Sequence, residues 1–469
     1  MASRSHIGNF AVWIAMIDLI ALVISSAVAV ALRIGQEDLP EYVYGHMNGW
    51  LIFFGSIILA NYFAGSYKIQ YSFSRFNLVV TWLFSMIFSV LVLSVFSYAW
   101  LSKVLLGRGI LLMSIVFYSV LSLVFKMAAC RTLFLRGYFV CKTVIMGIGA
   151  RARDMKNIIE SEFILPVHKV VAFVNVTDTG GSPGTIDGVA VINGTLETFE
   201  KIIRNMQINL IITTIEDRQK DKIFYSQLRH LRFEGIELLN TFGAIEMYLG
   251  KTPMDLMDED TMVHVAMESG LPVIRRFKRF TDVLVSVLSC PIWLPVGLIV
   301  ACLIKITEPR SPILYSQLRI GQFGRVFRMY KFRTMVEGAE KNTGPTWSVE
   351  QDPRITPLGR ILRKYRLDEI PQLINVLKGE MSLVGPRPER PELHAELEKK
   401  IPFFGERLNV MPGLTGWAQI RSPYGNSVED AARKLEYDIY YIKHLSISLD
   451  LQIILRTIRI VLFGLEKRG

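Results

Sequence analysis

The stretch that decides the architecture is VLVSVLSCPIWLPVGLIVACLI, residues 283–304. It holds 22 uncharged residues, which is long enough to cross a membrane at about 1.5 Å per residue. Pro291 and Pro295 lie in its middle. Because proline removes a helix hydrogen bond and clashes with the preceding turn, the sequence predicts a sharp bend there.

Basic residues flank this stretch on both sides: Arg275, Arg276, Lys278 and Arg279 precede it, and Lys305 and Arg310 follow it. A simple span would place one basic flank outside the cell, against the positive-inside rule. A re-entrant helix over residues 280–306, entering and leaving on the cytoplasmic face, satisfies both the prolines and the charges. An ordinary proline-kinked span is the alternative.

Four further apolar runs lie near the N-terminus, at residues 10–32, 50–67, 78–101 and 109–125. They predict a four-helix transmembrane domain over residues 1–135, with both ends in the cytoplasm by the bias of the flanking basic residues. Asp18 is the one charge in the first run. A carboxylate in a membrane segment is either functional or part of helix packing, and here packing is favoured over function.

The middle of the chain has an α/β pattern. A short apolar strand at 143–146 is followed by Gly147-Ile148-Gly149-Ala150-Arg151-Ala152, which is similar to a glycine-rich nucleotide turn. The second strand ends in Asn175, with no acidic residue to hold a ribose. The pattern therefore favours a Rossmann-like cytoplasmic domain over residues 136–270 without a bound dinucleotide.

The acidic triplet Asp258-Glu259-Asp260 has two interpretations. It is a solvated loop, or it is an Asp-x-Asp metal site of the kind that many glycosyltransferases use. The loop is the favoured interpretation.

The charge of the 469 residues is unevenly distributed. There are 53 basic and 42 acidic residues, a net charge of +11, and residues 275–469 alone hold 31 basic and 20 acidic residues. Such a region favours anionic partners: nucleic acid, lipid headgroups or a phosphorylated substrate. With 51% hydrophobic residues the chain is not disordered, and its four cysteines provide neither a disulfide framework nor a zinc pattern.

Three clusters in this basic third are suited to phosphate chemistry. Lys331 and Arg333 alternate along a predicted strand end; Asp368 and Glu369 follow a basic run that ends in Arg366; and two prolines flank Arg387. Arginine forks bind phosphate oxygens, and a carboxylate nearby can hold Mg²⁺ or attack phosphorus. The basic neighbours are expected to keep both carboxylates ionised.

Four strings in this region resemble a known family. They are Lys331-Phe332-Arg333-Thr334-Met335, Leu367-Asp368-Glu369-Ile370-Pro371-Gln372-Leu373, Gly385-Pro386-Arg387-Pro388-Glu389 and Pro412-Gly413-Leu414-Thr415-Gly416-Trp417. Bacterial polyprenyl-phosphate hexose-1-phosphate transferases carry nearly the same strings in this order. The whole chain resembles the long form, with four N-terminal spans and a Rossmann-like domain, that begins exopolysaccharide synthesis. One departure is Cys290 before Pro291, where many relatives have serine.

The resemblance implies a monotopic catalytic domain over residues 271–469, at the bacterial inner membrane and facing the cytoplasm. It implies transfer of hexose-1-phosphate from a UDP-hexose, glucose before galactose, to undecaprenyl phosphate with release of UMP. Asp368 would be the nucleophile. Glu369 would help to hold Mg²⁺, so that both carboxylates are metal ligands. Lys331, Arg333, Arg366 and Arg387 would contact the phosphates or the uridine. A homodimer is compatible with this organisation.

Three rival functions remain open on the sequence alone. A glycosyltransferase that used the acidic triplet would release UDP instead of UMP. A nucleotide-gated channel or transporter would explain residues 1–270 but leave the basic third unused. A nucleic-acid binder is disfavoured, because the basic residues accompany a membrane helix and no nucleic-acid motif. The C-terminal stretch 435–465 is read either as amphipathic helices on the membrane surface or as helices packed on the catalytic core.

Overall fold

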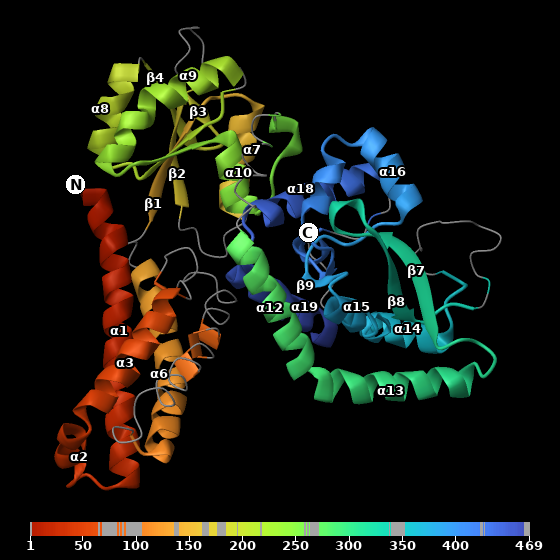
Figure 1. Cartoon of the computed structure of the whole chain (residues 1–469). Helices are drawn as coiled ribbons and strands as arrows, with labels where there is room; N and C mark the ends of the chain where they lie inside the picture. The colour runs from red at the N-terminus through yellow and green to blue at the C-terminus, as the bar shows by residue number, and fades with distance from the viewer. Residues whose placement is uncertain are drawn as a thin grey trace. The chain divides into compact units, whose positions relative to one another are not determined.

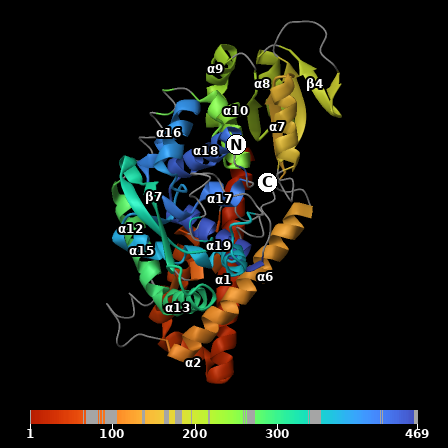
Figure 2. The ribbon, with the colours of Figure 1, turned by 90° about the vertical axis from the view of Figure 1, so that its right-hand side faces the viewer.

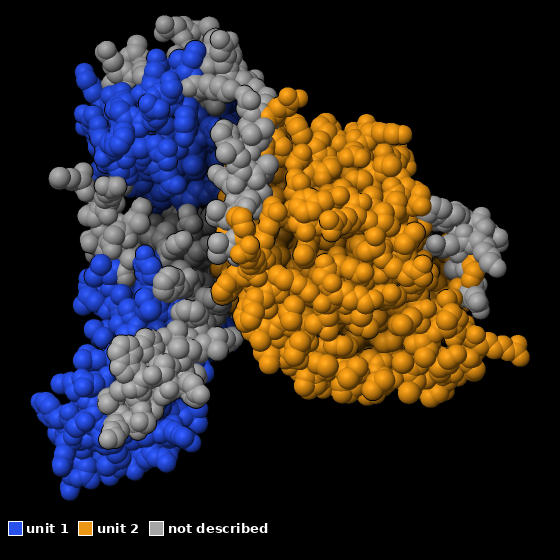
Figure 3. Space-filling view, in the orientation of Figure 1, with its two compact units in different colours: residues 1–249 blue, residues 250–469 orange. Residues whose placement is uncertain are grey.

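The computed structural model divides the chain into two compact units, residues 1–249 and 250–469 (Figure 3). It describes residues 2–63, 66–67, 82–83, 85–86, 89–90, 106–135, 140–161, 168–175, 184–194, 196–215, 218–257, 259, 262, 272–336, 338, 352–422, 425 and 427–463. The predicted three-domain division, with boundaries after residues 135 and 270, stays a prediction.

Long apolar helices begin the first unit. They are α1 (Ala2–Arg33), α3 (Met47–Phe63) and α6 (Arg108–Leu135), and the short helix α2 (Leu39–Gly45) lies between α1 and α3 in the sequence. Within the described part of the chain, three helices are long and apolar enough to cross a membrane: those containing 12–33, 108–129 and 290–307. The pair α2 and α3, bent by 79°, would make a fourth. Most of the predicted run at 78–101 lies outside the described residues.

Asp18 lies fully buried between α1 and α6, and it is paired. Its carboxylate is 2.8 Å from the Lys126 ammonium and accepts hydrogen bonds from Ser122 Oγ (2.7 Å) and Tyr118 Oη (3.1 Å). Asn61 of α3 donates to the same tyrosine hydroxyl at 2.8 Å. The intramembrane charge thus joins three helices, as the packing interpretation requires.

The rest of the first unit is a six-stranded sheet with helices on both faces (Figures 1 and 2). The strand order is β3-β4-β2-β1-β5-β6, parallel except for β3. The strands are β1 (Cys141–Met146), β2 (His168–Asn175), β3 (Thr185–Ile186), β4 (Val189–Asn193), β5 (Leu210–Thr213) and β6 (Glu237–Asn240). The helices are α7 (Ala150–Ser161), α8 (Leu196–Met206), α9 (Arg218–Leu228), η1 (Arg229–Glu234) and α10 (Thr241–Leu249). The predicted parallel α/β pattern is confirmed.

At the glycine-rich turn, Gly147 is bonded to the neighbouring strand β2, and Gly149 accepts from the first turn of α7. Gly147 has φ +124° and its N–H donates to the Val174 carbonyl at 2.9 Å. A Cβ at Gly147 would come within 2.8 Å of Thr214 Oγ1. The glycine is therefore explained by the close approach of the neighbouring strand.

The second unit begins with η2 (Met254–Leu256) and two helices, α12 (Pro272–Leu288) and α13 (Cys290–Thr307). They meet at a sharp corner (Figure 1). The corner lies at Ser289, and Pro291 follows in the first turn of α13, where a missing N–H costs nothing. The helix continues through Pro295. Trp293 Nε1 donates to the Ser286 carbonyl at 2.9 Å, and Ser289 Oγ donates to that of Val285 at 2.6 Å, which satisfies the end of α12.

The remaining elements surround two small sheets. The antiparallel pair is β7 (Leu314–Ile320) and β8 (Val326–Phe332), joined by η3 (Gln322–Gly324); the parallel pair is β9 (Ser382–Val384) and β10 (Gly413–Thr415). The helices are α14 (Pro357–Lys364), η4 (Leu367–Glu369), α15 (Gln372–Lys378), α16 (Pro391–Lys400), η5 (Phe404–Asn409), α17 (Trp417–Arg421), α18 (Val428–Lys443) and α19 (Ile447–Phe463). Buried residues of α18, including Leu435 and Ile439, pack in the core, so this helix follows the packing interpretation.

Candidate active site

The two adjacent carboxylates lie on the short helix η4. Asp368 and Glu369 are each only 7% exposed. The residue that starts this turn, Arg366, has left-handed backbone angles (φ 52°, ψ 24°), which a side chain other than glycine rarely adopts. Such strain persists only where the surroundings enforce it, and it is concentrated at functional sites.

Helix α14 delivers the chain to this turn. Thr356 caps it by accepting from the Gly359 N–H at 3.0 Å, and Pro357 occupies the first helical turn. Gly359 lies against the backbone of Thr334, where a Cβ would collide with the carbonyl oxygen. This contact fixes α14 against the chain that follows β8.

Three basic side chains converge on Glu369. Its Oε1 is 3.2 Å from Lys331 Nζ and 3.1 Å from Arg387 Nη2, and its Oε2 is 3.4 Å from Arg366 Nη1. Burial alone would raise the pKa of Glu369, but the charges of these three residues outweigh it and hold that pKa below the usual range. Glu369 is therefore the ionised centre of a cationic cluster. Burial in turn lowers the pKa of Lys331, against the charge of Glu369.

Asp368 has a different electrostatic environment. Burial first, and then the charge of Glu369, raise its pKa above the usual range, against the opposing charges of Lys331, Arg363 and Arg387. The charges of the basic neighbours therefore outweigh the effect of burial on the pKa at Glu369 but not at Asp368. At Asp368 burial and the ionised neighbour outweigh the opposing charges and raise the pKa; that this carboxyl is ionised at neutral pH stays a prediction.

The predicted site residues are not all gathered at the carboxylates. Arg333 Nε donates to the Pro312 carbonyl at 3.1 Å, so this guanidinium turns toward the chain that precedes β7. Arg363, which the sequence did not single out, donates to Thr334 Oγ1 at 3.0 Å, and its charge acts on Asp368. Its position in the basic run just before the acidic pair was the available signal.

Helix α13 lies directly beneath the site. Val300 and Ile304 are buried in one cluster with Phe332 of β8 and partly buried Ile370. A Cβ at Gly297 would be 3.6 Å from Ile370, which shows how closely η4 approaches this helix. Large apolar side chains of α13 are exposed: Ile292, Leu294, Leu298, Ile299, Leu303 and Ile306. The turn that carries the carboxylates thus packs against a helix whose exposed apolar surface is suited to contact with lipid.

Among the described residues, no three His, Cys, Asp or Glu side chains gather as a metal site. Magnesium commonly takes only one or two protein carboxylates, with waters and substrate phosphates as its other ligands. Asp368 fits that mode. Glu369 fits it less well, because both of its oxygens already face cations. Of the acidic triplet, Asp258 and Asp260 lie outside the described residues.

Two buried carboxylates thus lie in a basic cluster on a turn that packs against an apolar helix, an arrangement suited to phosphoryl chemistry at a membrane. Comparison with known proteins adds a family match. Residues 273–464 match the bacterial sugar transferase family, which confirms the predicted resemblance for this part of the chain.

Several curated bacterial proteins are similar to this chain. One is the UDP-N-acetylgalactosamine-undecaprenyl-phosphate N-acetylgalactosaminephosphotransferase of Aeromonas hydrophila, 39% identical over 48% of this chain and 52% of that protein. The undecaprenyl-phosphate galactose phosphotransferase of Salmonella typhimurium is 29% identical over 70% and 69% of the two chains. The UDP-glucose:undecaprenyl-phosphate glucose-1-phosphate transferase of Escherichia coli is 34% identical over 42% and 45%. The first match thus spans about half of its relative.

Proposed function

We propose that this protein transfers hexose-1-phosphate from a UDP-hexose to undecaprenyl phosphate and releases UMP, the priming step of exopolysaccharide synthesis. UDP-glucose is the first donor to test, because the long-form resemblance favours it. The names of the similar proteins add galactose and N-acetylgalactosamine as the alternatives. The family match supports the proposed activity, and the names of the similar proteins support undecaprenyl phosphate as the proposed acceptor.

The observation that carries this proposal is the placement of the Asp368–Glu369 pair. A diphosphate donor needs cations for its oxygens, and Lys331, Arg366 and Arg387 surround Glu369 within 3.4 Å. A lipid phosphate acceptor needs access from the membrane surface, and α13 packs beneath the same turn. Both requirements are met at one place.

In the proposed reaction, a carboxylate oxygen of Asp368 attacks the sugar-proximal phosphorus of the donor. The bond from this phosphorus to the bridging oxygen breaks, and UMP leaves with that oxygen and the bonding electron pair. A phosphate oxygen of undecaprenyl phosphate then attacks the same phosphorus. The acyl-phosphate bond breaks, Asp368 is regenerated as a carboxylate, and the product is a lipid diphosphosugar.

The other residues would orient the donor and balance its charge. Glu369 holds Lys331, Arg366 and Arg387 together, so that their remaining donors face the diphosphate. Arg333 would act farther out, toward the uridine, since its Nε is bonded to Pro312. Mg²⁺ would be held by Asp368, with Glu369 as its neighbour, and when bound it would neutralise phosphate charge.

We further propose that the chain lies in the bacterial inner membrane with residues 136–469 in the cytoplasm and α12–α13 as the re-entrant element. The basic residues on both sides of α13 and its exposed apolar surface support this topology. The side chains of Glu234 and Glu396 are exposed. Cysteines that replace them should be labelled only after the cells are permeabilised. Labelling of the Glu396 position in intact cells would show that α13 crosses the membrane.

The function is tested with purified protein in detergent, undecaprenyl phosphate and a panel of UDP-sugars. We expect UMP as the released nucleotide, with one sugar strongly preferred. Release of UDP would instead identify the rival glycosyltransferase. Nucleotide-dependent flux without a lipid product would identify the rival transporter.

The covalent step has its own test. Donor labelled in the sugar-proximal phosphate and incubated without acceptor should leave label on denatured protein, and hydroxylamine should remove it, as it removes acyl phosphates. Asp368→Asn should carry no label. Asp352→Asn is the matched control. Asp352 is also a buried carboxylate, but in the part of the chain that the structure describes its side chain bonds Arg354, a residue outside the proposed donor site, and the variant should label like the wild type. Label on Asp368→Asn would place the nucleophile elsewhere.

A further inference from the structure

The loop Gly385–Glu389 carries Arg387 to the site, and its two halves are held differently. The first half is fixed by the small parallel sheet: Gly385 N–H donates to the Thr415 carbonyl at 2.8 Å, and Gly413 N–H donates to that of Pro386 at 2.9 Å. In the second half, three successive carbonyls accept from three other donors. Arg387 accepts from Arg407 (2.9 Å), Pro388 from Arg319 (3.0 Å) and Glu389 from the Ile320 N–H (3.0 Å).

Arg407 of η5 makes the most of these contacts. Its Nη2 donates both to the Arg387 carbonyl and to Asp438 Oδ2, at 2.9 and 2.8 Å, and its Nη1 is 3.8 Å from Glu389 Oε1. Arg407 is 8% exposed and Asp438, on α18, is 2% exposed. The guanidinium also lies over the Phe404 ring, 5.0 Å from its centre. This fork therefore links α18 and η5 to both ends of the Arg387–Glu389 segment.

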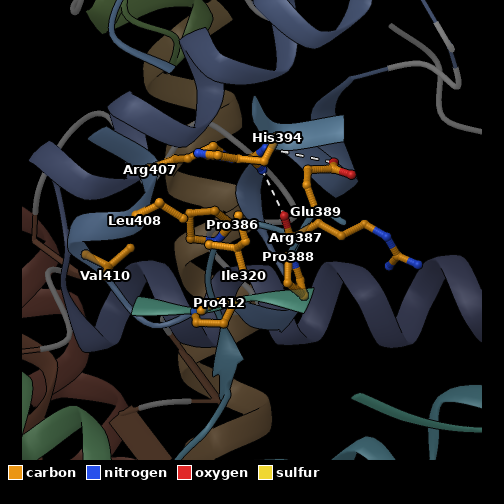
Figure 4. A pocket seen from close by; sticks show the side chains of 11 residues that line it. Ile320, Pro386, Arg387, Pro388, Glu389, His394, Arg407, Leu408, Val410 and Pro412 are labelled. Atoms are coloured by element: carbon orange, nitrogen blue, oxygen red, sulfur yellow. Dashed lines mark hydrogen bonds and ion pairs between the residues drawn. The ribbon is translucent and has the colours of Figure 1, made fainter. Parts of the chain in front are cut away.

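Arg407 contacts the backbone of the loop, whereas Glu369 contacts the Arg387 side chain. Arg407 lines a pocket of ≈ 10 Å³, room for about one water molecule, together with Pro386, Pro388 and His394 (Figure 4). Figure 4 shows the Arg387 side chain extending away from this pocket. The Arg387 guanidinium meets Glu369 at 3.1 Å, while its backbone carbonyl is bonded to Arg407. Arg407 can thus set the position of Arg387 without contacting the substrate.

We propose that Arg407, held by Asp438, is a positioning residue that fixes the backbone of Arg387 and thereby aims its guanidinium at the phosphate site. The role rests on the proposed function, since it assigns Arg387 to the donor phosphates. The fork divides these contacts between two nitrogens: Nη2 serves the Arg387 carbonyl and Asp438, while Nη1 faces Glu389. Lysine offers a single nitrogen and would keep only part of this geometry.

The test is a double-mutant cycle between Arg407→Gln and Arg387→Gln, read as kcat/KM for UMP release. In the wild-type background, loss of a charge-assisted hydrogen bond should reduce kcat/KM by about 10- to 100-fold, at tenfold per about 1.4 kcal/mol. In the Arg387→Gln background, the same change should cost less than about threefold, because the group that Arg407 positions is already gone. Equal losses in the two backgrounds would overturn the positioning role.

Two more variants extend the cycle. Arg407→Lys should recover part of the activity lost in Arg407→Gln. Asp438→Asn keeps an acceptor for Arg407 but removes the charge. Its loss of kcat/KM should likewise be larger where Arg387 is present than in the Arg387→Gln background. This variant therefore provides the test if Arg407→Gln fails to fold. Arg433→Gln is the matched control. Arg433 lies on α18 with Asp438, is paired with Asp430 among the described residues, and the variant should keep wild-type kcat/KM.

The wild-type enzyme separates this proposal from the proposed function. If it releases UMP, the cycle alone decides the positioning role. If it releases none, the proposed function fails, and the cycle is measured on the dissociation constant of UDP. There too, weakening by Arg407→Gln only where Arg387 is present supports the role, and equal weakening in both backgrounds overturns it.

Discussion

Asp368 and Glu369 are neighbours with equal burial, yet only the amide variant of Glu369 should lower the stability of the domain. Glu369→Gln leaves Lys331, Arg366 and Arg387 facing one another without their shared counter-charge. Breaking a buried pair costs about 3–5 kcal/mol. The Arg387 and Arg366 side chains are 40% and 28% exposed, so solvent screens part of the repulsion and the lower end, about 3 kcal/mol, applies. Asp368→Asn removes a carboxylate whose ionisation burial opposes, and stability should stay or rise.

The measurement is thermal unfolding of the detergent-solubilised protein followed by circular dichroism. For a domain of about 200 residues, 3 kcal/mol corresponds to a lowering of Tm by about 6–12 °C. Because the folded pKa of Glu369 is depressed, its stabilisation is fully present above the unfolded pKa of about 4.3 and is lost progressively as pH falls from there towards the much lower folded pKa, so the difference between the two proteins should shrink steadily below about pH 4. Equal Tm values at pH 7 for the wild type and Glu369→Gln, or an equal loss in Asp368→Asn, would refute this electrostatic account.

Three further predictions concern the framework. Lys126→Met leaves the Asp18 carboxylate buried without its cation, so the free energy of unfolding should fall by about 3–5 kcal/mol and less folded protein should be recovered from membranes. The double variant Lys126→Met with Asp18→Asn should recover much of this stability and yield. Gly359→Ala should abolish UMP release and lower Tm through collision with the Thr334 backbone, whereas Gly297→Ala, with only ordinary contacts, is the tolerated control. Pro291→Ala with Pro295→Ala should favour a straight helix over α12 and α13, with loss of activity and altered cysteine labelling; unchanged behaviour would assign the corner to the Ser289 and Trp293 contacts.

Local chemistry allowed several features to be predicted from the sequence. The apolar helices, the parallel α/β pattern and the family follow from runs and motifs a few residues long. The sequence also predicted that the three phosphate-suited clusters form one site, and in the structure Lys331 and Arg387 both contact Glu369. These features depend on periodicity and on the type of each residue, which are visible in one dimension.

Other features depend on contacts that the sequence does not display. Arg407 and Asp438 are 31 positions apart, on elements whose packing is set by the whole core, and neither belongs to a recognised string. Arg333 alternates with Lys331 and was expected on the same face, but its Nε donates a hydrogen bond to the Pro312 carbonyl. Pro295 was expected to bend the helix, yet the corner is at Ser289, where side chains satisfy the freed carbonyls of α12. In each case a tertiary hydrogen bond decides the outcome.

The contact between α13 and η4 offers a physical reason for combining a membrane element with phosphate chemistry. A soluble nucleotide and a membrane-bound phosphate can react only where a charged site lies at headgroup depth. Here Gly297 of α13 approaches Ile370, two residues after Asp368, while the other face of the helix exposes large apolar side chains. Burial of that face in lipid would fix the height of η4 above the hydrocarbon, since the two elements share one cluster with Phe332 and Leu362. In the proposed reaction, helix packing would then set the depth of the site in the membrane, and the charges around Glu369 would need only to hold the phosphates.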